Sequence, residues 1–220
     1  MARHPRADLN RRDVTLGLMA AGLLPALSQA QGPRRPEEGA DFRGVSPRAP
    51  VEAPAGRIEV VEFFWYGCPH CHAFEPQLDA WSRQLPADVA LRRVPVAFRE
   101  DFVPQQKLFY ALEALGRLDL HARVFHTVHV ERQPTHRDDT ILAWAVRQGL
   151  DRARFQEAYN SFGVATRARR ALQLQEAYQV EGVPALGVAG RFYTDGQAAG
   201  SMPRALQVVD YLVAEVRRGR

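Results

Sequence analysis

The pattern of apolar and polar residues predicts a βαβ unit in the first half of the chain. Residues 57–66 (RIEVVEFFWY) are rich in β-branched and aromatic side chains, which is typical of a central strand buried on both faces. A turn at 67–69 ends this strand. Apolar residues then recur at spacings of four, three and four, as on one face of a helix: Phe74, Leu78, Trp81 and Leu85. Residues 89–96 indicate a second strand, which completes the unit.

A helical insertion is predicted after the second strand. The next strand signal is Ala185–Val188, and the intervening 97–184 is far longer than the roughly dozen residues that a simple crossover needs. Helical periodicity recurs within this gap at 105–115, 140–148, 152–159 and 168–178, with Gly116 and Gly149 as expected helix ends. We therefore predict an α/β domain with a helical subdomain, at about 100–179, inserted between the second and third core strands.

The C-terminal part predicts a hairpin and one more helix. Gly190 and Arg191 form a turn signal, so 191–194 is the expected hairpin partner of the third strand. A last amphipathic helix opens at Ser201-Met202-Pro203 and runs through Arg217. The core domain is thus expected to cover 57–217.

The first thirty residues have the pattern of an export signal. Arginines lie in 1–13, an apolar run follows at 14–27, and Ser28-Gln29-Ala30 supplies the small residues of a cleavage site after Ala30. The run is shorter than the about 20 apolar residues of a membrane span, although an N-terminal anchor helix is the alternative. Arg11-Arg12 is similar to a twin-arginine signal, but Thr15 weakens the match, so both export routes stay open.

Residues 31–56 contain five prolines and few large apolar side chains. Proline cannot donate to a sheet and restricts the residue before it, so this composition favours a linker. Residues 41–45 are the expected exception, as a short edge strand.

Composition narrows the possible functions only moderately. The 220 residues are 46% hydrophobic and 25% charged, which excludes a disordered chain. The net charge of +4 comes without the basic stripe and interleaved aromatics of a nucleic-acid surface, so no nucleic-acid partner is expected. Two cysteines three residues apart, Cys68 and Cys71, are too few for a disulfide scaffold and suit chemistry better.

The Cys68-Pro69-His70-Cys71 sequence predicts a reactive thiol. Pro69 suits the first position of a helix, which makes Cys68 the N-cap, surrounded by free backbone N–H groups and the positive end of the helix dipole. Both this placement and His70 favour the thiolate and should lower the pKa of Cys68. A disulfide whose leaving sulfur is stabilised in this way is readily given up, so the pair should be an oxidant, with Cys71 shielded as the resolving thiol.

Two further features are candidates for the same site. Glu62 interrupts the apolar strand six residues before Cys68, and a buried carboxylate there could accept or relay the proton of Cys71. An Arg-paired structural residue is the alternative for Glu62. Val183-Pro184 directly precedes the third strand, where a proline suggests an edge position or a cis bond.

The segment from Glu62 to Cys71 (EFFWYGCPHC), followed by Phe74-Glu75, resembles the active-site segment of the DsbA family of periplasmic thiol:disulfide oxidoreductases. Val183-Pro184-Ala185 is similar to that family's cis-proline loop. The resemblance covers nearly all of the chain from about residue 57, and it implies a thioredoxin-like fold. The Pro-rich segment 31–56 is longer than the resemblance leads us to expect.

The resemblance also implies roles and partners. Cys68 would be the exposed nucleophile and Cys71 the buried thiol, while Pro69 and His70 tune the redox potential. Val183 and cis-Pro184 would face the disulfide and bind substrate backbone, and Glu62 and Glu75 match acidic positions near the site. Arg93 is a candidate for a nearby basic residue. Expected partners are unfolded or newly exported cysteine-containing proteins and a quinone-linked membrane oxidase of the DsbB type. A periplasmic monomer without metal or organic cofactor is expected.

Three other functions remain open from the sequence. Cys68 to His72 satisfies the Cys-x-x-Cys-His pattern of c-type haem attachment, with His72 and Met202 as possible axial ligands. A disulfide reductase or isomerase would use the same fold. A metal-binding module could use the nearby histidines His121, His126, His129 and His136. Only His126 and His129 among them have helical spacing.

Overall fold

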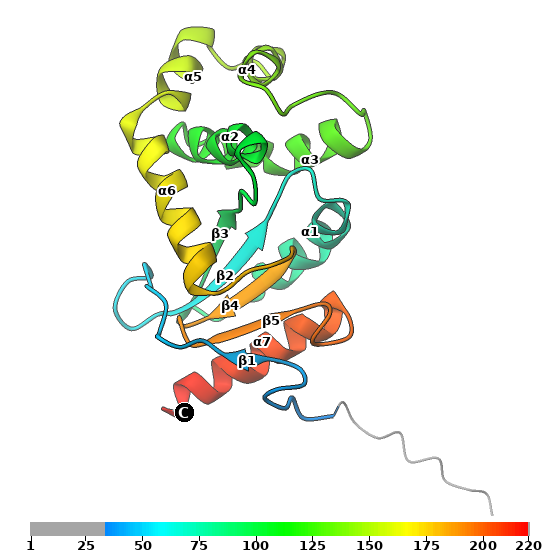
Figure 1. Cartoon of the computed structure of the whole chain (residues 1–220), viewed down its shortest axis with the longest axis vertical. Coiled ribbons are helices and arrows are strands. Elements are labelled where there is room, and N and C mark those ends of the chain that lie inside the picture. The colour runs from blue at the N-terminus through cyan, green and yellow to red at the C-terminus, as the bar shows by residue number, and fades with distance from the viewer. Residues whose placement is uncertain (1–33, 220) are drawn as a thin grey trace, which may run out of the picture. The chain divides into compact units, whose positions relative to one another are not determined.

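The computed structural model describes residues 34–219, and the elements below lie in the unit that begins at Arg35. Over these residues five strands form one mixed sheet in the order β1-β5-β4-β2-β3 (Figure 1). The strands are β1 (Arg43–Gly44), β2 (Ile58–Phe64), β3 (Val89–Pro95), β4 (Ala185–Val188) and β5 (Phe192–Asp195). The predicted export signal, 1–30, lies outside the described residues.

The predicted βαβ unit is confirmed. β2 and β3 are parallel, with Glu62 opposite Arg93, and α1 (Pro69–Ser82) connects them. β4 runs antiparallel to β2, and β5 runs antiparallel to β4, which confirms the expected hairpin. The strand order and the inserted helices are those of a thioredoxin-like fold, as the resemblance implies.

Side chains of β2 belong to two different cores. Val60 packs in one apolar cluster with Phe74 and Leu78 of α1 and with the inner face of α7 (Met202–Arg217). Val61 and Phe63 point the other way, into a cluster shared with the helical insertion. Because both faces of the strand are covered, its sequence is a nearly continuous apolar run.

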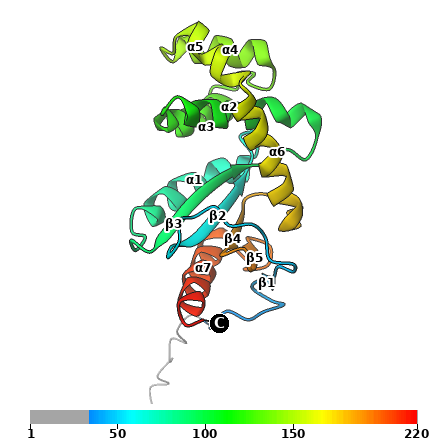
Figure 2. The same cartoon turned by 90° about the vertical axis from the view of Figure 1, so that its left-hand side faces the viewer.

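The insertion between β3 and β4 is helical, as predicted, and Figure 2 shows most of its helices at one end of the sheet, while the last helix of the insertion runs back alongside the strands. Large buried side chains, including Phe109, Phe125, Trp144 and Phe155, form its centre. The indole of Trp144 donates to Thr127 Oγ1 at 3.0 Å. The helices are η1 (Glu100–Phe102), α2 (Val103–Ala114), η2 (Leu118–Leu120), α3 (His121–His129), α4 (Asp138–Arg147), α5 (Arg152–Tyr159) and α6 (Phe162–Ala177).

The sequence and structure differ in detail at several helices. The periodicity did not predict α3, because its apolar stripe alternates with three histidines. α6 begins at Phe162, six residues before the predicted start, where Ser161 caps it by accepting from Val164 N. α1 ends at Ser82, so Leu85 belongs to the following loop rather than to the helix.

Part of the Pro-rich segment packs on the domain. β1 pairs antiparallel with β5 in the register Arg43↔Tyr193, which confirms the expected short edge strand. Phe42 and Val45 are buried, and Thr194 Oγ1 donates to Asp41 O at 2.7 Å.

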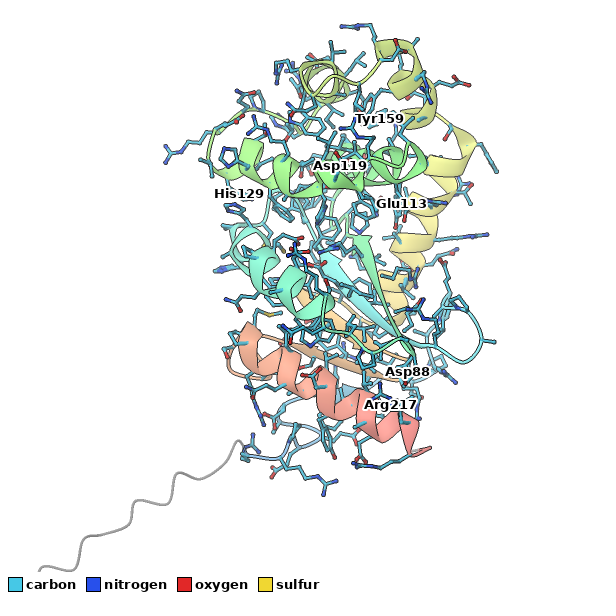
Figure 3. All side chains as sticks on the ribbon, turned by 180° about the vertical axis from the view of Figure 1, so that it is seen from behind. Asp88, Glu113, Asp119, His129, Tyr159 and Arg217 are labelled. Atoms are coloured by element: carbon cyan, nitrogen blue, oxygen red, sulfur yellow. The ribbon has the colours of Figure 1, made fainter. Side chains whose placement is uncertain are left out.

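The last helix is fixed at both ends. Ser201 caps its N-terminus by accepting from Arg204 N. Near its C-terminus, Arg217 binds both carboxylate oxygens of Asp88 at 2.7 Å (Figure 3). None of the helices described between residues 34 and 219 is both long enough and apolar enough to cross a membrane.

Candidate redox site at the start of α1

The register of the sheet brings two distant segments together. Phe63 pairs with Ala185, so the residues that follow β2 lie beside those that precede β4. These segments carry the Cys68–Cys71 pair and the Val183–Pro184 bond, which is cis, as the resemblance implies. Cys68 Sγ lies 3.3 Å from Val183 O and donates to it as a thiol.

Cys68 occupies the N-cap of α1, as the sequence predicts. Its sulfur accepts from the backbone N–H of Cys71 at 3.3 Å, and Pro69 fills the first helical position, where a missing N–H costs nothing. Hydrogen bonding from Cys71 lowers the pKa of the Cys68 thiol to about 6, against the opposing effect of burial. The backbone N–H and the charge of His70 lower this pKa further.

Cys71 lies one turn further into the helix and has no exposed surface, whereas Cys68 retains 6%. Burial raises the pKa of the Cys71 thiol, and its hydrogen bond to Cys68 raises that pKa further. The two sulfurs are therefore chemically unequal. Cys68 is the thiolate at neutral pH and Cys71 is the protonated thiol.

The turn into α1 needs a glycine. A Cβ at Gly67 would lie 2.3 Å from the Trp65 ring, which stacks on Phe102 at a centroid distance of 3.8 Å. Cys68 N donates to Trp65 O at 3.0 Å and closes the turn. Any larger residue at position 67 would displace the indole or the turn that presents Cys68.

Glu62 is fully buried in the middle of β2, beside Arg93 of β3. Arg93 Nε lies 3.2 Å from Glu62 Oε2 without the geometry of a hydrogen bond, while Arg93 Nη2 donates to Glu75 at 2.8 Å. Burial and the charge of Glu75 raise the pKa of Glu62 to about 8, although Arg93 opposes them. One guanidinium thus serves two carboxyl groups, and that of Glu62 keeps its proton at neutral pH.

This buried polar group extends beyond the residues that the sequence suggested. His121 Nε2 lies 3.4 Å from Glu75 Oε2, and Nδ1 of the same ring shares a hydrogen bond of 2.8 Å with the Tyr66 hydroxyl. Burial lowers the pKa of His121, so the ring is neutral at pH 7. Sequence reasoning missed the pairing of Tyr66 with His121 because the two residues are 55 positions apart.

Two other histidines join the insertion to α1. His72 and His129 stack at a centroid distance of 4.8 Å with ring planes 8° apart, and His129 Nε2 donates to Tyr66 O at 2.8 Å (Figure 3). Burial lowers the pKa of His72, and His129 and His126 lower it further. His136 takes no part in this contact. Within residues 34–219, no three His, Cys, Asp or Glu side chains are arranged to hold a metal ion.

An open cavity of about 430 Å³ borders the Cys68–Cys71 segment at His70 and the Val183–Pro184 segment. His70, Val183 and Pro184 line one side of it, and Met202 of α7 lines another. His70 is exposed at this rim, one residue after Pro69. The cavity leaves room for a polypeptide segment beside Val183, whose carbonyl contacts Cys68.

A thioredoxin-like domain with a low-pKa Cys-x-x-Cys thiol at a helix N-terminus, facing a proline loop, defines the class of thiol:disulfide oxidoreductases. Comparison with known proteins narrows this class. A family model described as DSBA-like thioredoxin domain matches residues 92–207.

The chain is 40% identical over 201 residues to the thiol:disulfide interchange protein DsbA of Burkholderia cepacia, covering 91% of this chain and 94% of the relative. It is 42% identical over 202 residues to DsbA of Bordetella parapertussis, covering 91% and 93%. The crystal structure of Pseudomonas aeruginosa DsbA superposes with a TM-score of 0.78 at 38% identity, covering 82% and 94%. The chain therefore belongs to the DsbA family.

Proposed function

We propose that the chain is a disulfide oxidase that donates its Cys68–Cys71 disulfide to newly exported polypeptides. The observation that carries this proposal is the inequality of the two sulfurs. The pKa of Cys68 is lowered to about 6 and that of Cys71 is raised, so reduction of the disulfide yields one stabilised anion. A stabilised leaving thiolate makes a disulfide a strong oxidant.

The reaction proceeds in two exchanges at Cys68. A substrate thiolate attacks Cys68 Sγ, the Cys68–Cys71 bond breaks, and the sulfur of Cys71 leaves and takes up a proton. A second substrate thiolate then attacks the substrate sulfur of the mixed disulfide. Cys68 departs as a thiolate, the substrate is oxidised by two electrons, and the enzyme holds the dithiol.

Surrounding residues have supporting roles in this proposal. Pro69 and His70 tune the potential by shaping the helix start and adding charge beside the sulfur. The carboxyl of Glu62, with a pKa of about 8, can supply or accept the proton that Cys71 exchanges. The Val183 backbone, beside cis-Pro184, pairs with an extended substrate segment, since its carbonyl already lies 3.3 Å from Cys68 Sγ.

The setting of the reaction follows from the same family. We propose that residues 1–30 are an export signal cleaved after Ala30, and that the enzyme works as a monomer in the periplasm. A quinone-linked membrane oxidase of the DsbB type would restore the disulfide. The arginine-rich start and the apolar run at 14–27 support export.

A glutathione redox titration of the purified protein tests the proposed direction of transfer. We expect a reduction potential near the about −120 mV that marks strongly oxidising couples of this type. A potential near the about −270 mV of thioredoxin would instead indicate a reductase and would overturn the oxidase assignment.

A further inference from the structure

The cavity beside Cys68 continues into a larger one that the proposed reaction does not use. The second cavity, of about 740 Å³, shares Gly182, Asp195 and Gln197 with the first. Together they form a trough that starts at His70 and reaches β1 along the loop before β4 and the end of β5. A substrate segment lying at Cys68 therefore has a defined direction in which its neighbouring residues can be accommodated.

The walls of the far half of this trough are charged. Asp195 accepts from Gln197 N at 3.0 Å and Ala198 N at 2.8 Å through one oxygen, and from the Tyr193 hydroxyl at 2.8 Å through the other. Its carboxylate is thus held in a fixed orientation. Glu181, two residues before Val183, is exposed on the same wall.

Both carboxylates act on the Tyr193 phenol, which lines the same cavity. Burial raises the pKa of Tyr193, Asp195 raises it further through its hydrogen bond and charge, Arg43 opposes them, and Glu181 adds a smaller upward effect. Glu181 and Asp195 thus line one cavity from different segments of the chain, the loop before β4 and the end of β5.

One cation, Arg43, lines the same cavity, but its hydrogen bonds are directed to the protein. Its Nη2 donates to Tyr178 O at 2.6 Å and to Gln179 O at 3.0 Å, and its guanidinium lies 4.1 Å over the Tyr193 ring. Glu181 and Asp195 outweigh it by one charge. The far part of the trough is therefore locally acidic on a chain whose net charge is +4, whereas His70 lies at its other end.

We propose that Glu181, together with Asp195, selects substrates that carry a lysine or arginine two residues from the reacting cysteine. This inference rests on the proposed function, in which the substrate backbone pairs with Val183. Side chains of an extended segment alternate between faces, so a residue two positions from the cysteine lies on the same face and beside Glu181. A cationic head there meets two carboxylates, while an acidic head meets repulsion.

The test measures how fast single-cysteine peptides form a mixed disulfide with the oxidised full-length enzyme, using quenched flow and mass spectrometry. Peptides carry Lys, Ala or Glu either two residues before or two residues after the cysteine, and a further pair carries Lys or Glu five residues away. We expect Lys to react about twofold to fivefold faster than Ala at one of the two near positions, the range of an exposed ion pair. Glu should react more slowly than Ala there.

Enzyme variants distinguish an effect of the trough from an effect of the overall charge of the protein. Glu181→Lys should invert the Lys-to-Glu preference at that position, and Glu181→Gln should reduce it. Glu176→Gln, which removes an exposed carboxylate on α6 outside the trough, should leave it unchanged. An equal preference at the distant position, or a preference that survives Glu181→Lys, would overturn the inference. Failure of the Ala peptides to react with the wild-type enzyme would instead count against the proposed function.

Discussion

Replacing Glu62 by Gln should stabilise the protein, and the gain should grow with pH. The carboxyl is fully buried on β2, and burial together with Glu75 raises its pKa to about 8, against about 4.3 in an unfolded chain. A group whose pKa is raised by folding contributes its full stabilisation of the folded state at pH values below its pKa in the unfolded chain. That stabilisation is lost as the pH rises towards the folded-state pKa of about 8.

The magnitude follows from the two pKa values of Glu62. One pKa unit corresponds to about 1.4 kcal/mol, so ionisation of Glu62 in the unfolded chain disfavours the folded state by about 1 kcal/mol at pH 5 and by up to about 4 kcal/mol at pH 7. Gln has no proton to lose and nearly the same shape. The difference in unfolding free energy between Glu62→Gln and wild type should therefore increase by up to about 3 kcal/mol between these pH values.

Urea denaturation of the oxidised protein at several pH values between 5 and 8.5 measures this difference without titration of free thiols. Glu176→Gln, an exposed carboxylate with no such environment, is the matched control and should show a small, pH-independent difference. A difference for Glu62→Gln that does not change with pH, or that shrinks as pH rises, would refute the assignment of a protonated buried carboxyl.

Three further changes give separate readouts. Cys71→Ser, whose Cys68 thiolate can attack only an existing disulfide, should trap mixed disulfides with disulfide-bonded substrates, visible by non-reducing mass spectrometry, because no Cys71 thiol is left to displace the substrate. His70→Ala should raise the pKa of Cys68 by less than about one unit and make the couple less oxidising in a glutathione titration, since His70 is a smaller cause of the shift than Cys71. Gly187→Ala should lower the unfolding free energy by about 1–3 kcal/mol in urea, because its Cβ would lie 2.4 Å from the Tyr178 ring.

Each of these has a control or a contrary result. A Cys68→Ser protein should trap nothing, and equal trapping by both serine variants would contradict the assigned roles. An unchanged potential in His70→Ala would remove that residue from redox tuning. Gly163→Ala, at the start of α6 with 3.7 Å to its nearest neighbour, should cost little, and an equal loss at both glycines would refute the packing argument.

The core of the fold could be predicted because local sequence and tertiary burial agree there. The apolar run of β2 is covered on both faces. Cys68-Pro69 marks the start of α1, because proline suits the first helical position and the cysteine before it caps the helix. α3 was missed because two of its histidines take packing positions: His121 is buried and His129 is stacked on aromatic rings. Such a role depends on partners that are distant in sequence, such as Tyr66 for His121.

The site was predictable in its chemistry but not in its connections. The motif placed Cys68 and Cys71, and a charged residue inside a buried strand marked Glu62. That Arg93 is shared between Glu62 and Glu75 follows from the register of β2 and β3, which the sequence alone does not set. The packing of Phe42 and Val45 likewise depends on β5, whereas proline content describes only the local backbone.

The most direct test is the ionisation of Cys68 in the reduced protein. The rate of alkylation by iodoacetamide, followed against pH with mass spectrometry to assign the modified sulfur, reports the thiolate fraction. Because the pKa of Cys71 is raised, its sulfur does not compete over the same range. The structure predicts a midpoint near pH 6 at Cys68. A midpoint between about 8 and 9, the range of an ordinary cysteine, would contradict the claim that α1 stabilises the anion that makes the disulfide an oxidant.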